Sequence, residues 1–442
     1  MKQDSDGLRI RDMRVHAIAI GDPPLRSSYG LHAPFALRTI IELESDAGVI
    51  GISEAHGGDA NVQRFEALRS RIVGADPWRL CGALLGMTDD SAGVGGDRSQ
   101  THHVPGENAL DASTRAYSAI EMACLDLIGK SVGVPVCDLL GGRLRDEVPF
   151  SAYLFYKHAG GGGSATDPRE DEYGECLTPE AMVRQARQMV AKYGFQSIKL
   201  KGGVLEPDAE IDTIRQLYAA FGPSVPLRID PNSAWTVETS VRVGRALKTE
   251  LAGEGYLEDP APGMDGMAAV RRALLASDVA TPLASNVAVT CFADLKRAVA
   301  EDAVQIVLCD PHYWGGVRQI QHLSKICRTF GLGLSMHSNS HLGVSLMAMA
   351  HAAAAAPFLN YACDTHYPWQ SDADEVVVGG RVPIVNGAVR LTNAPGLGVE
   401  LDPDRLARGR ERLATCGLRN RDDEAEMRKY VDPAWKRIVP RW

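Results

Sequence analysis

The chain has 442 residues, more than the roughly 250–300 residues at which one hydrophobic core stops growing, so we expect one large domain and a smaller one. Apolar residues make up 45% and charged residues 23%, as in globular proteins. The net charge of −9 gives no electrostatic basis for a nucleic-acid partner, so small-molecule chemistry is the expected activity.

The cysteines and the apolar stretches indicate a cytoplasmic protein. The nine cysteines are scattered, odd in number and without a CxxC pair, which is typical of reduced thiols. The first ten residues carry charges where a signal peptide needs an apolar core. The most apolar later stretch, residues 346–359, is short and contains His351, so we expect no membrane span.

Residues 1–145 begin with strand-like segments and continue with a helical one. Residues 13–20 and 38–45 have the composition of strands, and residues 113–133 repeat apolar side chains at helical spacing. Strands followed by a helix predict a separate α+β domain, which we expect to cap the larger domain.

Residues 146–372 have the pattern of a (β/α)-barrel. Short β-branched runs end in polar residues, and each is followed by an amphipathic segment of helix length. Eight such runs begin at residues 148, 197, 226, 254, 281, 303, 332 and 358. Polar residues at six run ends recur every 24–29 residues, namely Lys201, Asp230, Glu258, Asn286, Asp310 and His337. Barrels of this kind place their chemistry at the C-terminal strand ends.

Two segments lie outside this pattern. Residues 157–176 are Gly-rich and then charged, which predicts a long loop that is either part of a lid or only an insertion. Residues 373–442 return to strand-like alternation and end in a polar helix. We expect this C-terminal segment to pack back on the capping domain.

Three of the run ends carry oxygen donors. Asp230, Glu258 and Asn286 follow consecutive predicted strands, so their side chains should converge at the barrel mouth. Carboxylate and amide oxygens suit a hard divalent cation such as Mg²⁺. One such residue alone is more often a helix cap, and only the set of three predicts a metal site.

Lys199 and Lys201 lie two residues apart in one predicted strand, so both side chains should face the barrel interior. Repulsion between the lysines, and a nearby metal, would lower the pKa of one of them toward neutrality and make it a general base. An exposed strand with a polar face is the alternative. A lysine on an inner strand is also typical of Schiff-base aldolases.

His337 and Asp310 end neighbouring predicted strands, so the carboxylate could orient one ring nitrogen while the other faces the metal. A histidine in such a polar run is otherwise more often a capping or solvated residue, and we interpret His341 in that way. Together the parts predict removal of an α-proton from a carboxylate substrate by Lys201 or His337. The metal and Lys199 would stabilise the enediolate.

These segments resemble the enolase superfamily and, within it, the D-glucarate dehydratase subgroup. The resemblance rests on YLFY, KYGFQSIKLKGGV, RIDPNSAWT, EDP, SN, DPHYWGG and MHSNSHLGVSLMAMAHAAAAAP. It implies a modified TIM barrel with an N-terminal capping domain, a Mg²⁺ cofactor, and dehydration of D-glucarate to 5-dehydro-4-deoxy-D-glucarate. It also implies that Asn232 and Asn339 join the catalytic residues, and that the sugar chain and distal carboxylate are held by His32, Tyr153, Phe155, His366 and Arg421.

Other activities remain open from the sequence. The same site could dehydrate or epimerise another hexarate, and a metal-free aldolase using Lys201 belongs to a different class of enzyme. A barrel that binds an acid sugar without turning it over is a third possibility. Barrels of this kind often associate, so we expect a homo-oligomer with a small-molecule acid-sugar substrate.

Overall fold

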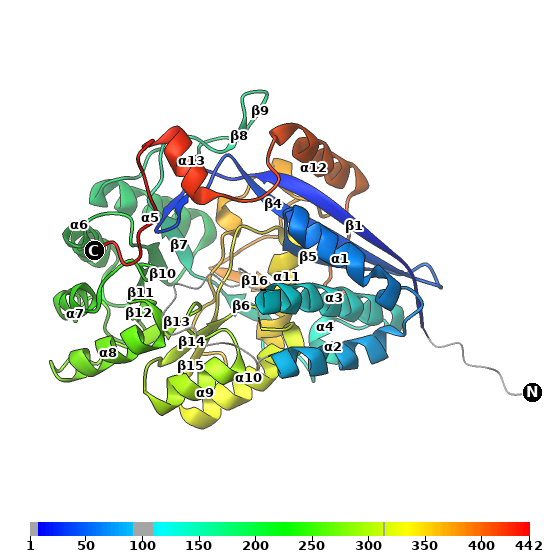
Figure 1. Ribbon diagram of the computed structural model, residues 1–442, viewed down its shortest axis with the longest axis horizontal. Helices are drawn as coiled ribbons and strands as arrows, with labels where there is room; N and C mark the ends of the chain where they lie inside the picture. Colours follow the sequence, from blue (N-terminus) through cyan, green and yellow to red (C-terminus); the bar gives the residue numbers. More distant parts are fainter. Residues whose placement is uncertain (1–7, 92–108, 313) are drawn as a thin grey trace, which may run out of the picture.

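The computed structural model describes residues 8–91, 109–312 and 314–442 (Figure 1). In the first described stretch, three antiparallel strands form a sheet of order β1-β4-β5, made of β1 (Ile10–Gly21), β4 (Phe35–Ser45) and β5 (Ile50–His56). Between β1 and β4 lies a small hairpin, the strap, made of β2 (Arg26–Ser27) and β3 (Gly30–Leu31). Helices α1 (Asp59–Ile72), α2 (Pro77–Ser91), α3 (Ala109–Val132) and α4 (Val136–Leu139) follow.

In the described part of the chain, seven parallel strands form a second, curled sheet in the order of the sequence. They are β7 (Ala152–Phe155), β10 (Ile198–Lys201), β11 (Leu227–Asp230), β12 (Tyr256–Glu258), β13 (Leu283–Ser285), β14 (Ile306–Cys309) and β15 (Gly333–Met336). All of their residues are buried, because helices cover the outer face and side chains fill the interior. This sheet confirms the modified TIM-barrel architecture.

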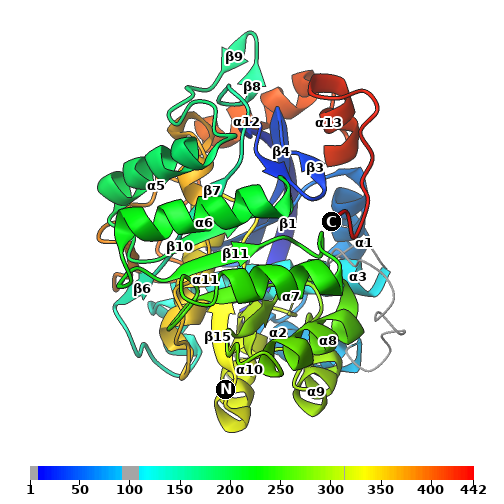
Figure 2. The same ribbon diagram turned by 90° about the vertical axis from the view of Figure 1, so that its left-hand side faces the viewer.

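The helices alternate with the strands and lie outside them, as Figure 2 shows for α5 to α8. They are α5 (Pro179–Tyr193), α6 (Pro207–Phe221), α7 (Val237–Ala246), α8 (Gly263–Leu275), α9 (Phe292–Ala300), α10 (Val317–Phe330) and α11 (Gly343–Ala355). Local sequence sets their ends. For example, Thr178 caps α5 by accepting a hydrogen bond from Ala181 N at 3.3 Å, and Gly194 ends the helix in the left-handed conformation.

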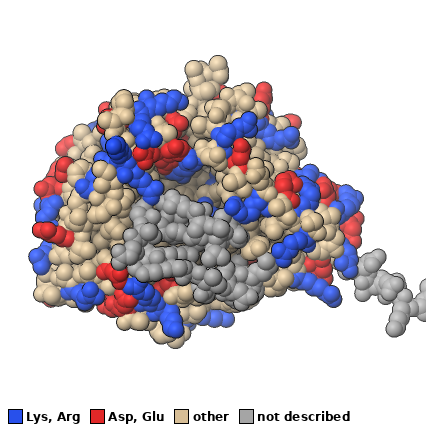
Figure 3. All heavy atoms as spheres, in the orientation of Figure 1, with Lys and Arg blue, Asp and Glu red and all other residues tan. Residues whose placement is uncertain are grey.

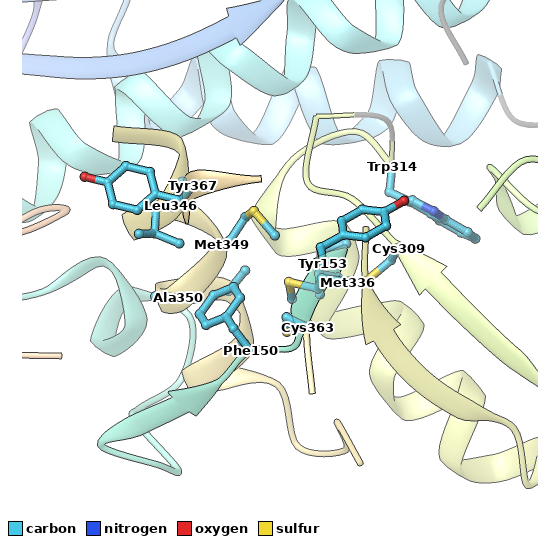
Figure 4. Packing of buried hydrophobic residues seen from close by; sticks show 14 of the residues in the cluster. Phe150, Tyr153, Cys309, Trp314, Met336, Leu346, Met349, Ala350, Cys363 and Tyr367 are labelled. Carbon is cyan, nitrogen blue, oxygen red and sulfur yellow. The ribbon is translucent and has the colours of Figure 1, made fainter. Parts of the chain in front are cut away.

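The prediction of a regular eighth strand at residues 358–364 is wrong, although the backbone of this segment closes the barrel. On one side Asp364 N donates to Met336 O at 2.8 Å, and on the other Cys363 N donates to Pro149 O at 2.9 Å. The side chain of Asn360 accepts a hydrogen bond from Leu334 N at 2.9 Å, which replaces a ladder bond and breaks the strand pattern. Figure 4 shows Cys363 beside Met336 and Tyr153 in the core.

The segment 157–176 is held by ion pairs. It contains a short hairpin of β8 (Gly163–Ser164) and β9 (Asp167–Pro168). The buried Lys157 donates to Asp171 Oδ1 at 2.8 Å and to Gly174 O at 2.7 Å. Arg169 donates through two nitrogens to Asp374, each at 2.7 Å. The predicted loop is therefore fastened both to itself and to the C-terminal segment.

The C-terminal segment contacts elements from the start of the chain (Figure 1). After the 3₁₀ turns η1 (Tyr367–Trp369) and η2 (Asp372–Asp374), strand β16 (Ala388–Arg390) pairs with β6 (Glu147–Pro149). Helix α12 (Pro403–Cys416) lies on β1, and its Arg412 donates to Ala19 O at 2.9 Å. Helix α13 (Asp423–Tyr430) lies on the strap, where Met427 and Trp435 pack against Leu31.

Acidic and basic side chains are interspersed on the face shown in Figure 3. Across the described residues, no helix combines the length and the apolar composition needed to cross a membrane.

Candidate active site

A small cavity of about 50 Å³ lies at the C-terminal ends of the barrel strands, beneath the strap. A volume of that size has room for no more than a few water molecules. Its walls come from the strap, the barrel and the chain before α13, and they include nine predicted site residues: His32, Phe155, Lys201, Asn232, Asn286, His337, Asn339, His366 and Arg421. Ser27, Tyr29 and Val287 complete the lining.

Lys199 is buried in a cage of negative charge. Its Nζ lies 2.6 Å from Asp364 Oδ2 and 2.5 Å from Glu258 Oε2, and it sits 4.6 Å from the centre of the Tyr153 ring. Burial lowers the pKa of Lys199, but the carboxylates of Asp364 and Glu258 raise it by more, so it lies well above the ordinary value. Lys199 is therefore held as a fixed positive charge, and the lowered pKa predicted for one of the two lysines does not apply to it.

Lys201 reaches the cavity from the same face of β10. Its Nζ donates to Asp230 Oδ2 at 2.6 Å. Tyr153 also donates to this oxygen, at 3.2 Å, while Asn232 donates from both its backbone and its amide to Asp230 Oδ1. Asn232 has a φ of 48°, the left-handed conformation that asparagine tolerates better than most residues. Asp230 thus gathers three predicted residues around one carboxylate.

Glu258 and Asn286 provide the other two predicted metal ligands. Burial and the nearby Asp230 raise the pKa of Glu258 well above its ordinary value, so a cation at this point would stabilise the ionised carboxylate. One end of the Asn286 amide lies 3.1 Å from Glu258 Oε1 and 3.0 Å from Asp259 Oδ2. As Nδ2, this end donates to both carboxylates. As Oδ1, it would face two negative oxygens, an arrangement that requires a cation between them.

The donor set therefore fits a hard divalent cation. Asp230, Glu258 and Asn286 lie at the ends of three neighbouring strands. The Asn286 amide lies 3.1 Å from Glu258 Oε1, and Asp230 and Glu258 both approach Lys199 Nζ, at 3.8 and 2.5 Å. Among the described residues, no three His, Cys, Asp or Glu side chains lie together as a metal site. The candidate site has two such residues, Asp230 and Glu258, and its third ligand is the amide of Asn286. The ammonium groups of Lys199 and Lys201 neutralise the same carboxylates in this structure.

His337 and Asp310 form the predicted pair. His337 Nδ1 lies 3.1 Å from Asp310 Oδ2, and Nε2 lies 3.2 Å from the end of the Asn286 amide. Burial lowers the pKa of His337, although the Asp310 carboxylate opposes this, so the site favours the neutral ring. His312 holds the other carboxylate oxygen of Asp310 with its backbone N at 2.8 Å and its Nδ1 at 2.7 Å.

Four of the five residues predicted to hold the sugar line the cavity, namely His32, Phe155, His366 and Arg421. Tyr153 is not part of the lining and packs behind Phe155, with 4.7 Å between the ring centres. His366 stacks with His32 at 6.3 Å between ring centres, and Phe155 lies 5.1 Å from His366. Arg421 donates to His32 Nε2 at 2.8 Å and to both oxygens of Asp423 at 2.6 Å. The guanidinium is therefore positioned by an internal carboxylate. The Asn339 amide lies 3.1 Å from His56 Nε2.

Two residues that control the charge of this site were not predicted from the sequence. Asp364 neutralises Lys199. Its position at the end of the eighth run was the available signal, because this run lies next to the first one when the barrel closes. His312 orients Asp310, and its position two residues after that aspartate was the available signal. His341, which we do not expect to take part in catalysis, lies 3.0 Å from Thr365 Oγ1 and outside the cavity lining.

Known proteins are similar to this chain in sequence and fold. Residues 181–405 match the family described as enolase C-terminal domain-like, and residues 24–141 match the mandelate racemase/muconate lactonizing enzyme N-terminal domain. A probable glucarate dehydratase of Streptomyces coelicolor is 45% identical, with 98% of this chain and 99% of that protein covered.

Two solved structures extend the likeness to the whole fold. An enolase from Pseudomonas fluorescens, with bound magnesium, potassium and tartrate, is 48% identical with a TM-score of 0.90, covering 99% of this chain and 100% of its own. An enolase from Mycobacterium smegmatis, complexed with tartrate, is 46% identical with a TM-score of 0.88, and each chain is covered completely. The chain therefore belongs to the enolase superfamily, with the two domains typical of its mandelate racemase and muconate lactonizing enzyme branch.

Proposed function

We propose that the protein is a Mg²⁺-dependent acid-sugar dehydratase that converts D-glucarate to 5-dehydro-4-deoxy-D-glucarate. One observation carries the proposal: two candidate bases, Lys201 and His337, line the same small cavity, and each is held by a carboxylate. The 45% identity to a probable glucarate dehydratase supports the substrate, and the tartrate in two related structures supports a diacid.

The metal would be held by Asp230, Glu258 and Asn286. When bound, Mg²⁺ would supply Lewis-acid stabilisation of the charge that develops on the substrate carboxylate. With two carboxylates and one neutral amide, the ligand set balances the charge of the cation, so a doubly negative substrate is not repelled. A third carboxylate in place of Asn286 would disfavour that substrate.

The side chains of the cavity would carry out the proton transfers. Lys201 or His337, on different sides of the substrate, would remove the proton beside the carboxylate, according to the configuration at that carbon. The fixed charge of Lys199 would stabilise the resulting enediolate. His337, protonated by the substrate when it is the base or by solvent when Lys201 is the base, would deliver this proton to the β-hydroxyl group, which leaves as water. The enol product would then become the keto acid.

The far end of the diacid would meet Arg421 and His32. The Asp423 carboxylate that now holds Arg421 must be outcompeted or joined by the distal carboxylate of the substrate. Because the cavity is smaller than a six-carbon diacid, we expect the strap and the chain before α13 to move outward when substrate binds.

A substrate screen tests the proposal. Hexarates, hexonates and pentonates are incubated with the enzyme and Mg²⁺, and the keto acid product is measured with semicarbazide. We expect D-glucarate to be the best substrate, activity to disappear on chelation, and activity to return with Mg²⁺. A monoacid that outperforms every hexarate would contradict the substrate, and full activity after exhaustive chelation would contradict the metal site.

A further inference from the structure

A second and larger cavity, of about 550 Å³, lies outside the active site. It is formed between the segment 157–176 and residues 368–384, which follow the last part of the barrel. Its volume is within the usual range of small-molecule sites, roughly 300–1,000 Å³. Trp369 separates it from the active site, because this side chain lines the second cavity while its ring packs edge-on against Phe155 at 5.9 Å.

The walls of this second cavity are fixed before any ligand arrives. Buried Lys157 and Arg169 tie the segment 157–176 to Asp171 and Asp374. Trp369 donates from Nε1 to Tyr153 O at 2.8 Å, and its ring contacts Tyr173 at 4.9 Å. Rigid walls reduce the ordering cost that a ligand must overcome.

Gln370 is the first sign of a ligand. Its side chain is only 3% exposed and lines the second cavity, yet neither its Oε1 nor its Nε2 has a hydrogen-bond partner in the described part of the chain. An unpaired buried amide costs free energy, so such a group needs a reason to be retained. Since the amide offers both a donor and an acceptor, hydroxyl groups are its natural partners.

Arg381 is the second sign. Its guanidinium lies over the Tyr367 ring at 4.7 Å and donates to Tyr367 O and Tyr193 Oη. Within the described residues, no carboxylate forms an ion pair with this guanidinium. The other basic side chains of the cavity are already paired, with Lys157 bound to Asp171, Arg169 to Asp374 and Lys192 to Glu172. Arg381 is therefore available for an anion.

We propose that the second cavity is a binding site for a small hydroxy-carboxylate, separate from the active site. The carboxylate pairs with Arg381, a neighbouring hydroxyl group exchanges hydrogen bonds with the Gln370 amide, and the carbon chain lies against Trp369 and Tyr173. A carboxylate on a guanidinium forms two charge-assisted hydrogen bonds, which makes Arg381 the main determinant of affinity.

The test measures binding of D-gluconate, a monocarboxylate with five hydroxyl groups, to the Mg²⁺-loaded full-length protein by isothermal titration calorimetry. We expect a saturable site whose affinity falls roughly 10- to 100-fold in Arg381→Gln and also falls in Gln370→Leu. Lys192→Gln is the matched control, because this lysine lines the same cavity but is paired and exposed. The affinity of this variant for D-gluconate should equal that of the wild type.

Thermal stability and turnover distinguish a ligand site from a structural role of these two residues. Gln370→Leu should keep or raise thermal stability while it loses the ligand, since it removes an unpaired buried amide; a structural role would instead lower the stability. Turnover of the acid sugar should be unchanged in Arg381→Gln, so a failure of the proposed enzyme activity leaves this test intact. Absence of saturable binding, or equal binding by wild type, Arg381→Gln and Gln370→Leu, would overturn the proposal.

Discussion

At the residue scale, the site is a set of charges that neutralise each other inside the protein. The strand-end spacing predicted which strands carry Lys201, Asp230, Glu258, Asn286 and His337, because the period of a βα unit fixes where each strand ends. Spacing could not predict how these charges pair. That depends on side-chain reach across the closed barrel, as between Lys199 and the distant Asp364.

Asp364→Asn tests this internal pairing. The change leaves the buried Lys199 with Glu258 at 2.5 Å and Asp230 at 3.8 Å, so we expect a loss of stability of about 3 kcal/mol, the lower end for breaking a buried ion pair. Equilibrium denaturation measures it. Glu172→Gln, which breaks an exposed pair with Lys192, should cost less than about 1 kcal/mol. Equal losses of stability in the two variants would refute the idea that the buried charge of Lys199 needs the Asp364 carboxylate.

Asp310→Asn tests the orientation and the charge of His337. Since Asp310 raises the pKa of His337, its removal should lower that pKa further and move the acidic limb of kcat/KM to lower pH. The misoriented ring should also reduce kcat/KM on the order of 100-fold. The pH profiles of kcat/KM are measured for the wild type and for Asp310→Asn at saturating Mg²⁺. A limb that moves to higher pH would contradict this role of the aspartate.

At the element scale, the strap and α13 close the cavity, and this arrangement was the least predictable. The capping sheet and the barrel helices follow from periodicity, whereas the strap and its neighbour His32 are held by contacts between residues almost 400 positions apart. Leu31 packs on Met427, and His32 accepts a hydrogen bond from Arg421. The eighth strand was lost because the Asn360 side chain takes the place of a ladder hydrogen bond. Sequence periodicity detects neither effect.

Gly30→Ala tests the closure of the strap on α13. Gly30 has a φ of 137°, and a Cβ there would overlap the backbone carbonyl of Asp423. The strap and α13 should separate, which would displace Arg421 and raise KM for the diacid about tenfold with a smaller change in kcat. Gly48→Ala controls for backbone strain alone, because Gly48 has a φ of 79° and no atom lies within 4 Å of an added Cβ. Similar kinetics for both variants would argue against the closure.

At the scale of the whole molecule, the chain joins three sequence segments into one site. The barrel supplies the candidate bases and metal ligands, the N-terminal segment supplies the strap, and the C-terminal segment returns to cover it. Order along the chain predicted the barrel because each strand pairs with the next one. The return of α12 to β1 and of α13 to the strap was expected in outline, but its contacts depend on packing that periodicity does not encode.

The most direct test of the two-base account is proton exchange at the α-carbon in deuterated water, followed by NMR. D-Glucarate and its C5 epimer are each incubated with Mg²⁺ and with wild type, Lys201→Ala or His337→Asn. The account predicts that wild type exchanges both epimers, that Lys201→Ala loses exchange with one, and that His337→Asn loses exchange with the other. Equal exchange of both epimers by either variant would contradict the placement of two bases on opposite faces of the substrate.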